Sequence, residues 1–255
     1  MAQPVATTHR VRAAAGIGLL AGFLSGLFGV GGGILIVPGL VLFMRMEQRR
    51  AHGTSLAAVV PIAAAGVIAY SIHGSVDWAS AALLAPGAAA GALVGTSALH
   101  RLGQRTLRYA FAGFLVLAAV RLLVDVPKAT GRAPIDVAVA AGLVAVGFIA
   151  GSLAGLLGVG GGIVIVPAMI VLFSTPDVVA KGTSLLVIIP TAVVGSVRNI
   201  ARQNADLPIA GVAGMLGVAS TLGGSQLAAH LNPTVSAVLF ALLLMAVATR
   251  LLFRG

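Results

Sequence analysis

Two glycine clusters are the residues of this chain best suited to bind a ligand. Each has three consecutive glycines and precedes an apolar helical segment; the clusters are Gly31, Gly32 and Gly33, and Gly160, Gly161 and Gly162. Such a turn carries no side chains, so its N–H groups and the positive end of the following helix can approach an anion. The pattern predicts an anion site made of backbone. The alternative is a tight turn that needs positive φ angles and contacts no ligand.

Two Thr-Ser pairs are the second set of candidate ligands. The pairs are Thr54 and Ser55 in the first half and Thr183 and Ser184 in the second, each at the start of an apolar segment. Their hydroxyls and nearby N-terminal amides offer neutral donors to an anion that must also leave. The alternative is that they cap their own helices. A basic residue, His52 or Lys181, precedes each pair, where a cation either attracts the anion or marks the interface.

The remaining polar residues suggest little further chemistry. Arg198 is a weaker candidate for substrate contact, because an arginine near a helix end commonly reaches to the membrane interface. Asp77 and Asp206 each precede a helical segment and are expected to be N-caps. The chain has no cysteine, no Ser/His/Asp set and no histidine cluster with ligand spacing. We therefore expect no catalytic residue, no metal and no cofactor.

These motifs recur because the whole chain is duplicated. The segment from Gly26 to Pro38 returns as Gly155 to Pro167, and the offset of 129 residues continues without a gap to the C-terminal helices. Residues 1–128 and 129–255 are therefore two repeats of one integral membrane domain. Membrane proteins built from duplicated halves are commonly transporters with a site between the halves.

Composition places the chain in a bilayer. It is 59% hydrophobic and 9% charged, whereas charged residues make up about a quarter of an average soluble domain. The formal charge of +10 is spread over loop ends without a basic tract, so a nucleic-acid partner is not expected. The partners that we expect are the lipid bilayer and a small anion, and the sequence leaves the oligomeric state open.

The apolar segments predict an all-α polytopic fold. They cover residues 12–44, 53–73, 78–99 and 106–124 in the first repeat, and 138–173, 182–203, 207–229 and 235–253 in the second. The first segment of each repeat is too long for one crossing of a ~30 Å core and contains a glycine cluster, which breaks helices. Each repeat is thus expected to be a glycine-broken hairpin plus three transmembrane helices, with the clusters near mid-membrane.

Loop charges predict the orientation, because Lys and Arg accumulate on the cytoplasmic side. The segments expected inside hold Arg10 and Arg12, Arg45 to Arg50, Arg101 to Arg108, Arg198 and Arg202, and Arg250 and Arg254. The segments expected outside are 73–77, 174–181 and 230–233, together with the linker that holds Asp125, Lys128 and Arg132 against the rule. This pattern gives two repeats of inverted topology, with both termini in the cytoplasm.

The paired motifs G-L-h-G-V-G-G-G-h-h-h-V-P and G-T-S-L, where h is hydrophobic, resemble the TauE/SafE family of bacterial membrane proteins over nearly the whole chain. The resemblance implies export of sulfite or related sulfur oxyanions and organosulfonates, and a location in the bacterial inner membrane. It also implies that the glycine clusters and Thr-Ser pairs are the hallmark residues.

The sequence thus favours a permease that exports a small oxyanion, which the resemblance implies to be a sulfur oxyanion or organosulfonate, through a midplane site between inverted repeats. A negative cell interior favours outward movement of one negative charge by about 2.3 kcal/mol per 100 mV. A membrane scaffold whose glycines serve only helix packing, and a cation transporter, are the alternatives. Alanine at Gly32 or Gly161 would either strain the backbone or fill the anion's space, and we expect the second effect to dominate.

Overall fold

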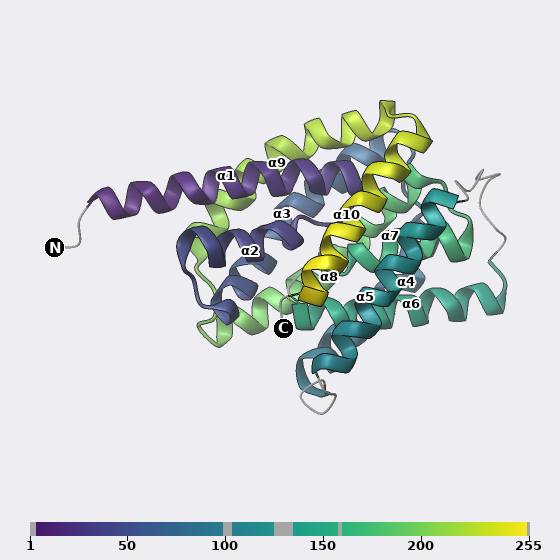
Figure 1. The fold of residues 1–255 in the computed structure, drawn as a ribbon, viewed down its shortest axis with the longest axis horizontal. Coiled ribbons are helices and arrows are strands. Elements are labelled where there is room, and N and C mark those ends of the chain that lie inside the picture. The colour runs from purple at the N-terminus through teal and green to yellow at the C-terminus, as the bar shows by residue number, and fades with distance from the viewer. Residues whose placement is uncertain (1–3, 99–103, 125–134, 158–159, 254–255) are drawn as a thin grey trace.

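The chain folds into α-helices throughout the part described by a computed structural model, which covers residues 4–98, 104–124, 135–157 and 160–253 (Figure 1). The first repeat supplies α1 (Pro4–Phe28), α2 (Gly33–Met44), α3 (Gln48–Ile72), α4 (Trp78–Ala98) and α5 (Gln104–Val124). The second supplies α6 (Val137–Leu157), α7 (Gly162–Phe173), α8 (Asp177–Ala201), α9 (Leu207–His230) and α10 (Pro233–Phe253). Arg101, Asp125, Lys128, Arg132, Arg254 and the expected repeat boundary lie outside the described residues.

The glycine clusters break the first apolar segment of each repeat, as predicted. α1 ends at Phe28 and α2 begins at Gly33, with positive φ at Gly31 (78°) and Gly32 (73°) between them. Gly160 and Gly161 take the equivalent angles, 85° and 78°, before α7. α2 and α7 have 12 residues each, or about 18 Å, so neither crosses a ~30 Å hydrocarbon core alone.

α3 and α8 begin five residues earlier than predicted, at Gln48 and Asp177 instead of residues 53 and 182. The residues between these starts and Gly53 or Gly182 include neither Pro nor Gly, so nothing stops the helix from extending beyond the predicted apolar segment. The segment from Asp177 to Lys181 is therefore helix rather than external loop. Because of this extension, the Thr-Ser pairs lie in the second turn and cannot cap their own helices.

Small residues let helices of different repeats pack at backbone contact. Gly18, Gly22 and Gly26 of α1 face α9, where an added Cβ would strike backbone atoms of Ala213, Gly217 and Thr221 respectively. In the same way, Gly147 and Gly151 of α6 face Leu84 and Ala88 of α4. Small residues at four-residue spacing allow this close approach of helix backbones in lipid. Residue numbers at the contacts increase in the same direction along the two helices of each pair, so the helices of each pair are parallel.

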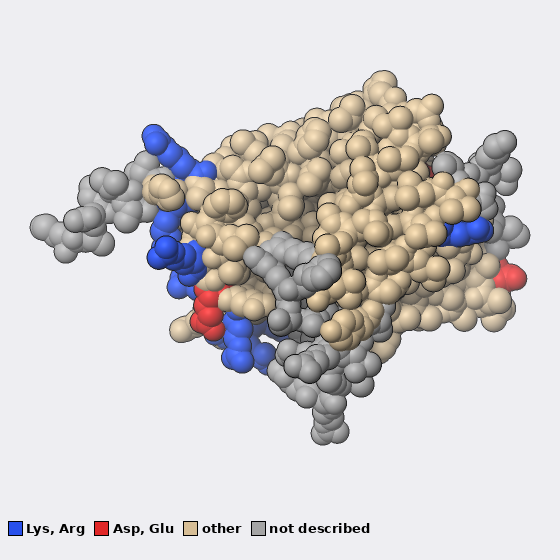
Figure 2. Space-filling model, in the orientation of Figure 1, with Lys and Arg blue, Asp and Glu red and all other residues tan. Residues whose placement is uncertain are grey.

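Polar contacts gather the loops into two groups at the ends of the long helices. In one group, Arg10 of α1 and Arg50 of α3 form ion pairs with Asp206 before α9, at 3.8 and 3.1 Å. In the other, the Asp77 N–H before α4 donates to Thr183 of α8, at 2.8 Å. Figure 2 shows that most of the visible Lys and Arg side chains lie at the end where α1 begins.

The outer surface is rich in large apolar side chains. Leu20, Phe43, Ile72, Leu117 and Leu242 are each more than half exposed, as expected of residues that face lipid. Among the described residues, α1, α3, α6, α8 and α9 are long and apolar enough to cross a membrane. The secondary structure of the described residues is therefore helical throughout, and the protein is embedded in a membrane.

The glycine contacts predict opposite effects of alanine at two neighbouring positions of α9. A Cβ on Gly224 would strike the Phe23 carbonyl oxygen of α1, whereas a Cβ on Gly223 meets nothing within 4 Å. We expect Gly224→Ala to destabilise the fold by roughly 1–3 kcal/mol through overpacking. Gly223→Ala should be neutral or stabilising by up to about 1 kcal/mol, because alanine favours helix. Thermal unfolding in detergent measures both, and equal midpoints would contradict the packing described here.

Candidate functional site

The turn between α1 and α2, here called the first glycine turn, and the turn before α7, the second glycine turn, meet at the centre of the molecule. We call their meeting point the junction. Gly31 and Gly160 both lie against Val59 of α3 and Ile188 of α8. A Cβ on Gly31 would be 3.0 Å from Ile188 Cδ1 and 3.5 Å from Val59 Cγ1; on Gly160 the corresponding nearest atoms are Ile188 Cγ2 at 3.4 Å and Val59 Cγ1 at 3.9 Å. Val59 and Ile188 are repeat equivalents, and each is the twelfth residue of a 25-residue helix. The turns therefore meet at the middle of α3 and α8.

Ser184 connects the two turns. Its Oγ donates a hydrogen bond to the Gly29 carbonyl of the first turn, at 2.6 Å. Gly162, at the start of α7, packs on the same atoms: an added Cβ would lie 2.7 Å from the Gly29 oxygen and 2.9 Å from Ser184 Oγ. Ser184 is fully buried. This predicted site residue is thus brought together with Gly162 of the second cluster and with Gly29, which lies two residues before the first cluster.

Each glycine turn ends at the N-cap residue of a short helix. Gly32 and Gly161 are the N-cap residues of α2 and α7. The carbonyl of each accepts hydrogen bonds of 3.0 and 3.1 Å from two N–H groups at the start of its own helix. The first N–H groups of any helix have no acceptor within that helix. An anion at the junction would find such donors from α2 and α7. All six cluster glycines are buried, so the junction is closed to solvent in this conformation.

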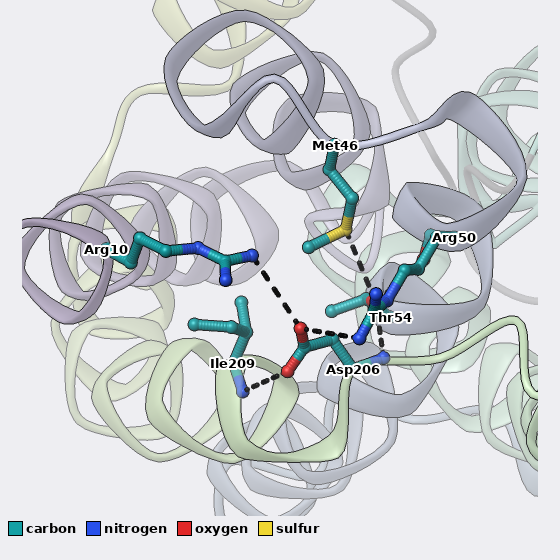
Figure 3. Close-up of polar contacts among 6 residues, drawn as sticks. All are labelled: Arg10, Met46, Arg50, Thr54, Asp206 and Ile209. Carbon is teal, nitrogen blue, oxygen red and sulfur yellow. Dashed lines mark hydrogen bonds and ion pairs between the residues drawn. The ribbon is translucent and has the colours of Figure 1, made fainter. Parts of the chain in front are cut away.

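Thr54 uses its hydroxyl to hold another helix. Its Oγ1 accepts the N–H of Asp206 at 2.9 Å and donates to the Arg50 carbonyl at 2.7 Å, with Met46 Sδ 3.7 Å away (Figure 3). Asp206 in turn caps α9 by accepting the N–H of Ile209. Thr54 therefore fixes the residue at which α9 begins.

Thr183 makes the equivalent contact in the second repeat, because its Oγ1 accepts the N–H of Asp77. Asp77 Oδ1 accepts the N–H groups of Ala79 and Ser80, both at 3.1 Å. The N-cap roles predicted for Asp77 and Asp206 are confirmed. The two threonines hold repeat-equivalent helix starts, so their direct contact with an anion stays a prediction.

Arg198 is not brought to the junction. It lies ten residues after Ile188, about 15 Å further along α8, and its Nη1 donates to the Leu93 carbonyl of α4 at 3.4 Å. Ser55 is fully buried in α3, at the position equivalent to Ser184. The structure thus gathers the glycine clusters with Ser184 and keeps Arg198 apart.

A buried ion pair beside the first turn was missed by the sequence analysis, which assigned its residues to a loop. Lys181 Nζ lies 2.7 Å from Asp177 Oδ2 and 2.6 Å from Ser236 Oγ of α10. Asp177 and Lys181 stand four residues apart, the spacing of a helical ion pair, which was the available signal. Val59 and Ile188 were also missed; their signal was their equivalence, two residues before Pro61 and Pro190.

Comparison with known proteins identifies the family. The family model described as sulfite exporter TauE/SafE matches residues 2–122 and 143–255. The chain belongs to the TauE/SafE family. The match covers both repeats, and the resemblance inferred from the glycine and Thr-Ser motifs is confirmed.

Curated TauE/SafE relatives are named as membrane transporters rather than enzymes. The chain is 31% identical over 211 residues to the probable membrane transporter protein YunE of Bacillus subtilis, covering 72% of this chain and 76% of the relative. It is 35% identical over 178 residues to a probable membrane transporter protein of Xylella fastidiosa, covering 68% and 67%. No solved structure matches the chain. The protein is a membrane transporter of this family.

The backbone angles in the turns predict strain as the main effect of alanine at Gly32. Gly32 has φ of 73° and faces the Ala21 carbonyl oxygen, 2.9 Å from an added Cβ, so the methyl would meet α1 backbone rather than an open cavity. Gly74 is the matched control, because its φ is 63° and nothing lies within 4 Å. Gly74→Ala should cost about 1–2 kcal/mol from the angle alone, and Gly32→Ala more.

Thermal unfolding without ligand measures this difference. A Gly32→Ala protein of unchanged stability that no longer transports would instead support the loss of a cavity, the effect that we first expected from the sequence.

Proposed function

We propose that the protein exports a small oxyanion, sulfite or a related sulfur oxyanion or organosulfonate, through the junction of the two glycine turns. One observation carries the proposal: both turns and Ser184 meet at the middle of the two long helices α3 and α8. Irregular backbone at membrane depth is tolerated only where protein or a water-filled path covers it. Discontinuous helices of transporters use such places to bind substrate.

The chemistry of the junction suits an anion that binds and leaves. The donors are backbone N–H groups at the starts of α2 and α7 together with a serine hydroxyl, all of them neutral. A neutral cradle holds an anion without the full desolvation of a fixed charge pair. Ser55 and Ser184 are the hydroxyls that we assign to the path, while Thr54 and Thr183 hold the helix starts beside it.

Repeats of inverted topology are the second part of the proposal. The parallel packing of α1 on α9 and of α6 on α4 supports it. α9 and α1 begin at the end with Arg10, Arg50 and Asp206, while α4 and its parallel partner α6 begin at the opposite end. Equivalent helices α1 and α6 thus enter from opposite sides. The positive-inside rule makes the arginine-rich end cytoplasmic, in a bacterial inner membrane.

Access to the buried junction requires movement of α3 and α8. Pro61 and Pro190 lie inside these helices, two residues after Val59 and Ile188. A proline removes one backbone hydrogen bond of its helix. Bending at these prolines would part Val59 from Ile188 on one side at a time. The closed junction described above is then an occluded state between inward-facing and outward-facing states.

Anion flux in proteoliposomes tests the proposal. Purified protein should release ³⁵S-labelled sulfite from vesicles at a rate that increases when the compartment holding sulfite is electrically negative. A membrane scaffold gives no flux, and a cation transporter gives a reversal potential set by the cation. Empty vesicles and vesicles with an unrelated membrane protein are the controls.

Removal of the hydroxyl that joins the turns should weaken transport selectively. Ser184→Ala removes the hydroxyl that donates to the Gly29 carbonyl and that we expect to turn toward a bound anion. A lost hydrogen bond to a charged group costs about 1.5–3 kcal/mol, or tenfold or more in apparent affinity. Thr191→Val is the matched control, because its buried hydroxyl bonds only carbonyls of its own helix. Equal flux and affinity in Ser184→Ala and wild type would show that the Ser184 hydroxyl does not bind the anion.

Single-cysteine labelling checks the topology, since the chain has no native cysteine. His73→Cys and Asn232→Cys should react with a membrane-impermeant maleimide on intact cells. Arg49→Cys and Arg202→Cys should react only after permeabilisation; all four native residues are exposed. Labelling of Asn232→Cys only after permeabilisation would overturn the inverted arrangement.

A further inference from the structure

A buried ion pair lies beside the first glycine turn, at the end of the molecule that we propose to be external. Lys181 is fully buried, and its Nζ contacts Asp177 Oδ2 at 2.7 Å and Ser236 Oγ at 2.6 Å. The Ser236 hydroxyl donates to the same Asp177 oxygen, at 2.7 Å. Lys181 is the only lysine or arginine that is buried among the residues whose side chains the structure describes.

The ion pair is in contact with the turn itself. A Cβ on Gly29 would lie 2.5 Å from Lys181 Cα, so the turn rests directly on α8 at this residue. The Lys181 ammonium is 5.9 Å from the ring centre of Phe28, the last residue of α1, and Phe28 stacks on Phe240 of α10. Ser184, which binds the Gly29 carbonyl, follows on α8 three residues later. The Lys181 side chain, paired with Asp177, therefore stands next to the proposed path.

The fold itself does not need this pair. The repeat equivalents of Asp177, Lys181 and Ser236 are Gln48, His52 and Leu107. α3 nevertheless has the same 25-residue length as α8, and Thr54 makes the same contact with a helix start as Thr183. The first repeat thus serves as an internal control: the helix forms and packs without the charges.

Stability does not explain the pair either. Burial of two charges carries a desolvation cost that their attraction often fails to offset, and well-packed neutral residues are commonly as stable. Ionisable residues within membrane segments usually mark the path of a substrate or an ion. The arrangement around Lys181 is also unequal: its own side chain is 0% exposed, whereas that of Asp177 is 18% exposed. Asp177 can therefore turn toward water while the ammonium stays in place.

We infer that Lys181 and Ser236 form an anion-binding site in which the Asp177 carboxylate takes the place of the transported oxyanion. The inference rests on the proposed function. A sulfite or sulfonate group offers oxygens to the Lys181 ammonium and the Ser236 hydroxyl as the carboxylate does, and Asp177 rotates outward when the anion arrives. When the anion leaves, Asp177 returns to the ammonium. The competition keeps the anion from binding too tightly to be released.

Binding and flux of ³⁵S-sulfite by purified variants test the inference. Asp177→Asn removes the competitor and keeps the cation, so the Kd for sulfite should fall by about tenfold. The double variant Asp177→Asn/Lys181→Gln removes the cation without leaving a buried charge unpaired, so its Kd should rise by about tenfold above that of wild type. Gln48→Asn/His52→Gln makes the matched change in the first repeat and should leave the Kd within about twofold of wild type.

The order of affinities decides between a site and a structural ion pair. A structural pair predicts that the double variant equals wild type and that Asp177→Asn alone binds no better, because only the single variant leaves a charge unpaired. That order would overturn the inference. Ser236→Ala keeps both charges and should weaken binding, which gives a second test if Asp177→Asn does not fold. If wild-type protein neither binds nor transports sulfite, sulfate, thiosulfate or sulfoacetate, the proposed function fails, and the inference fails with it.

Discussion

The structure depends on one constraint: backbone polar groups inside a bilayer must find partners within the protein. A turn in the middle of a membrane breaks the helical ladder, and each freed carbonyl then needs a donor. At the end of α1 the Ser25 carbonyl accepts the N–H of Gly29, at 2.8 Å. The Gly26 carbonyl accepts the Tyr70 hydroxyl, and the Gly29 carbonyl accepts Ser184, both at 2.6 Å. The donors come from α3 and α8, so these helices must cover the turn.

The same constraint explains why so many glycines lie at contacts between repeats. α1 lies against α9 and α6 against α4 at backbone contact, and a side chain at Gly22 or Gly151 would hold these backbones apart. The Thr221 hydroxyl then reaches the Gly22 carbonyl of α1, at 2.9 Å. In lipid the hydrophobic effect does not pull helices together, so this close approach and its hydrogen bonds contribute the association energy. The glycine stripe and the glycine turn thus serve one arrangement.

The sequence predicted the features that depend on local pattern or on duplication. The helix breaks at the two glycine clusters, the N-caps at Asp77 and Asp206, and the glycine contacts of α1 all follow from spacing within one segment. The start of α3 was wrong by five residues because a helix extends past its apolar part when nothing stops it. The contact from Thr54 to Asp206 spans 152 residues, and no local pattern encodes such a partner.

The centre of the site shows the same limit. Val59 and Ile188 lie in apolar helices where any residue could face the core, and only the fold places these two against both turns. The spacing of Asp177 and Lys181 could be read from the sequence, but the third member, Ser236, stands on another helix 55 residues further on. Candidate residues shared by both repeats could therefore be recognised in the sequence because they recur. The complete polar group that occurs in one repeat only could be recognised only in the structure.

The difference between the repeats bears on the direction of transport. Thr54 and Thr183 make equivalent hydrogen bonds, and Gly31 and Gly160 have the same neighbours, so the two sides of the junction are similar in these contacts. The charged residues of the two sides differ. Asp206 pairs with two arginines that are about half exposed, whereas Asp177 pairs with a lysine that has no exposed surface. Exposed pairs are screened strongly by water and salt, whereas a partly buried pair is screened less. In the proposed mechanism, an anion that displaces Asp177 therefore meets a weakly screened ammonium on one side of the junction only.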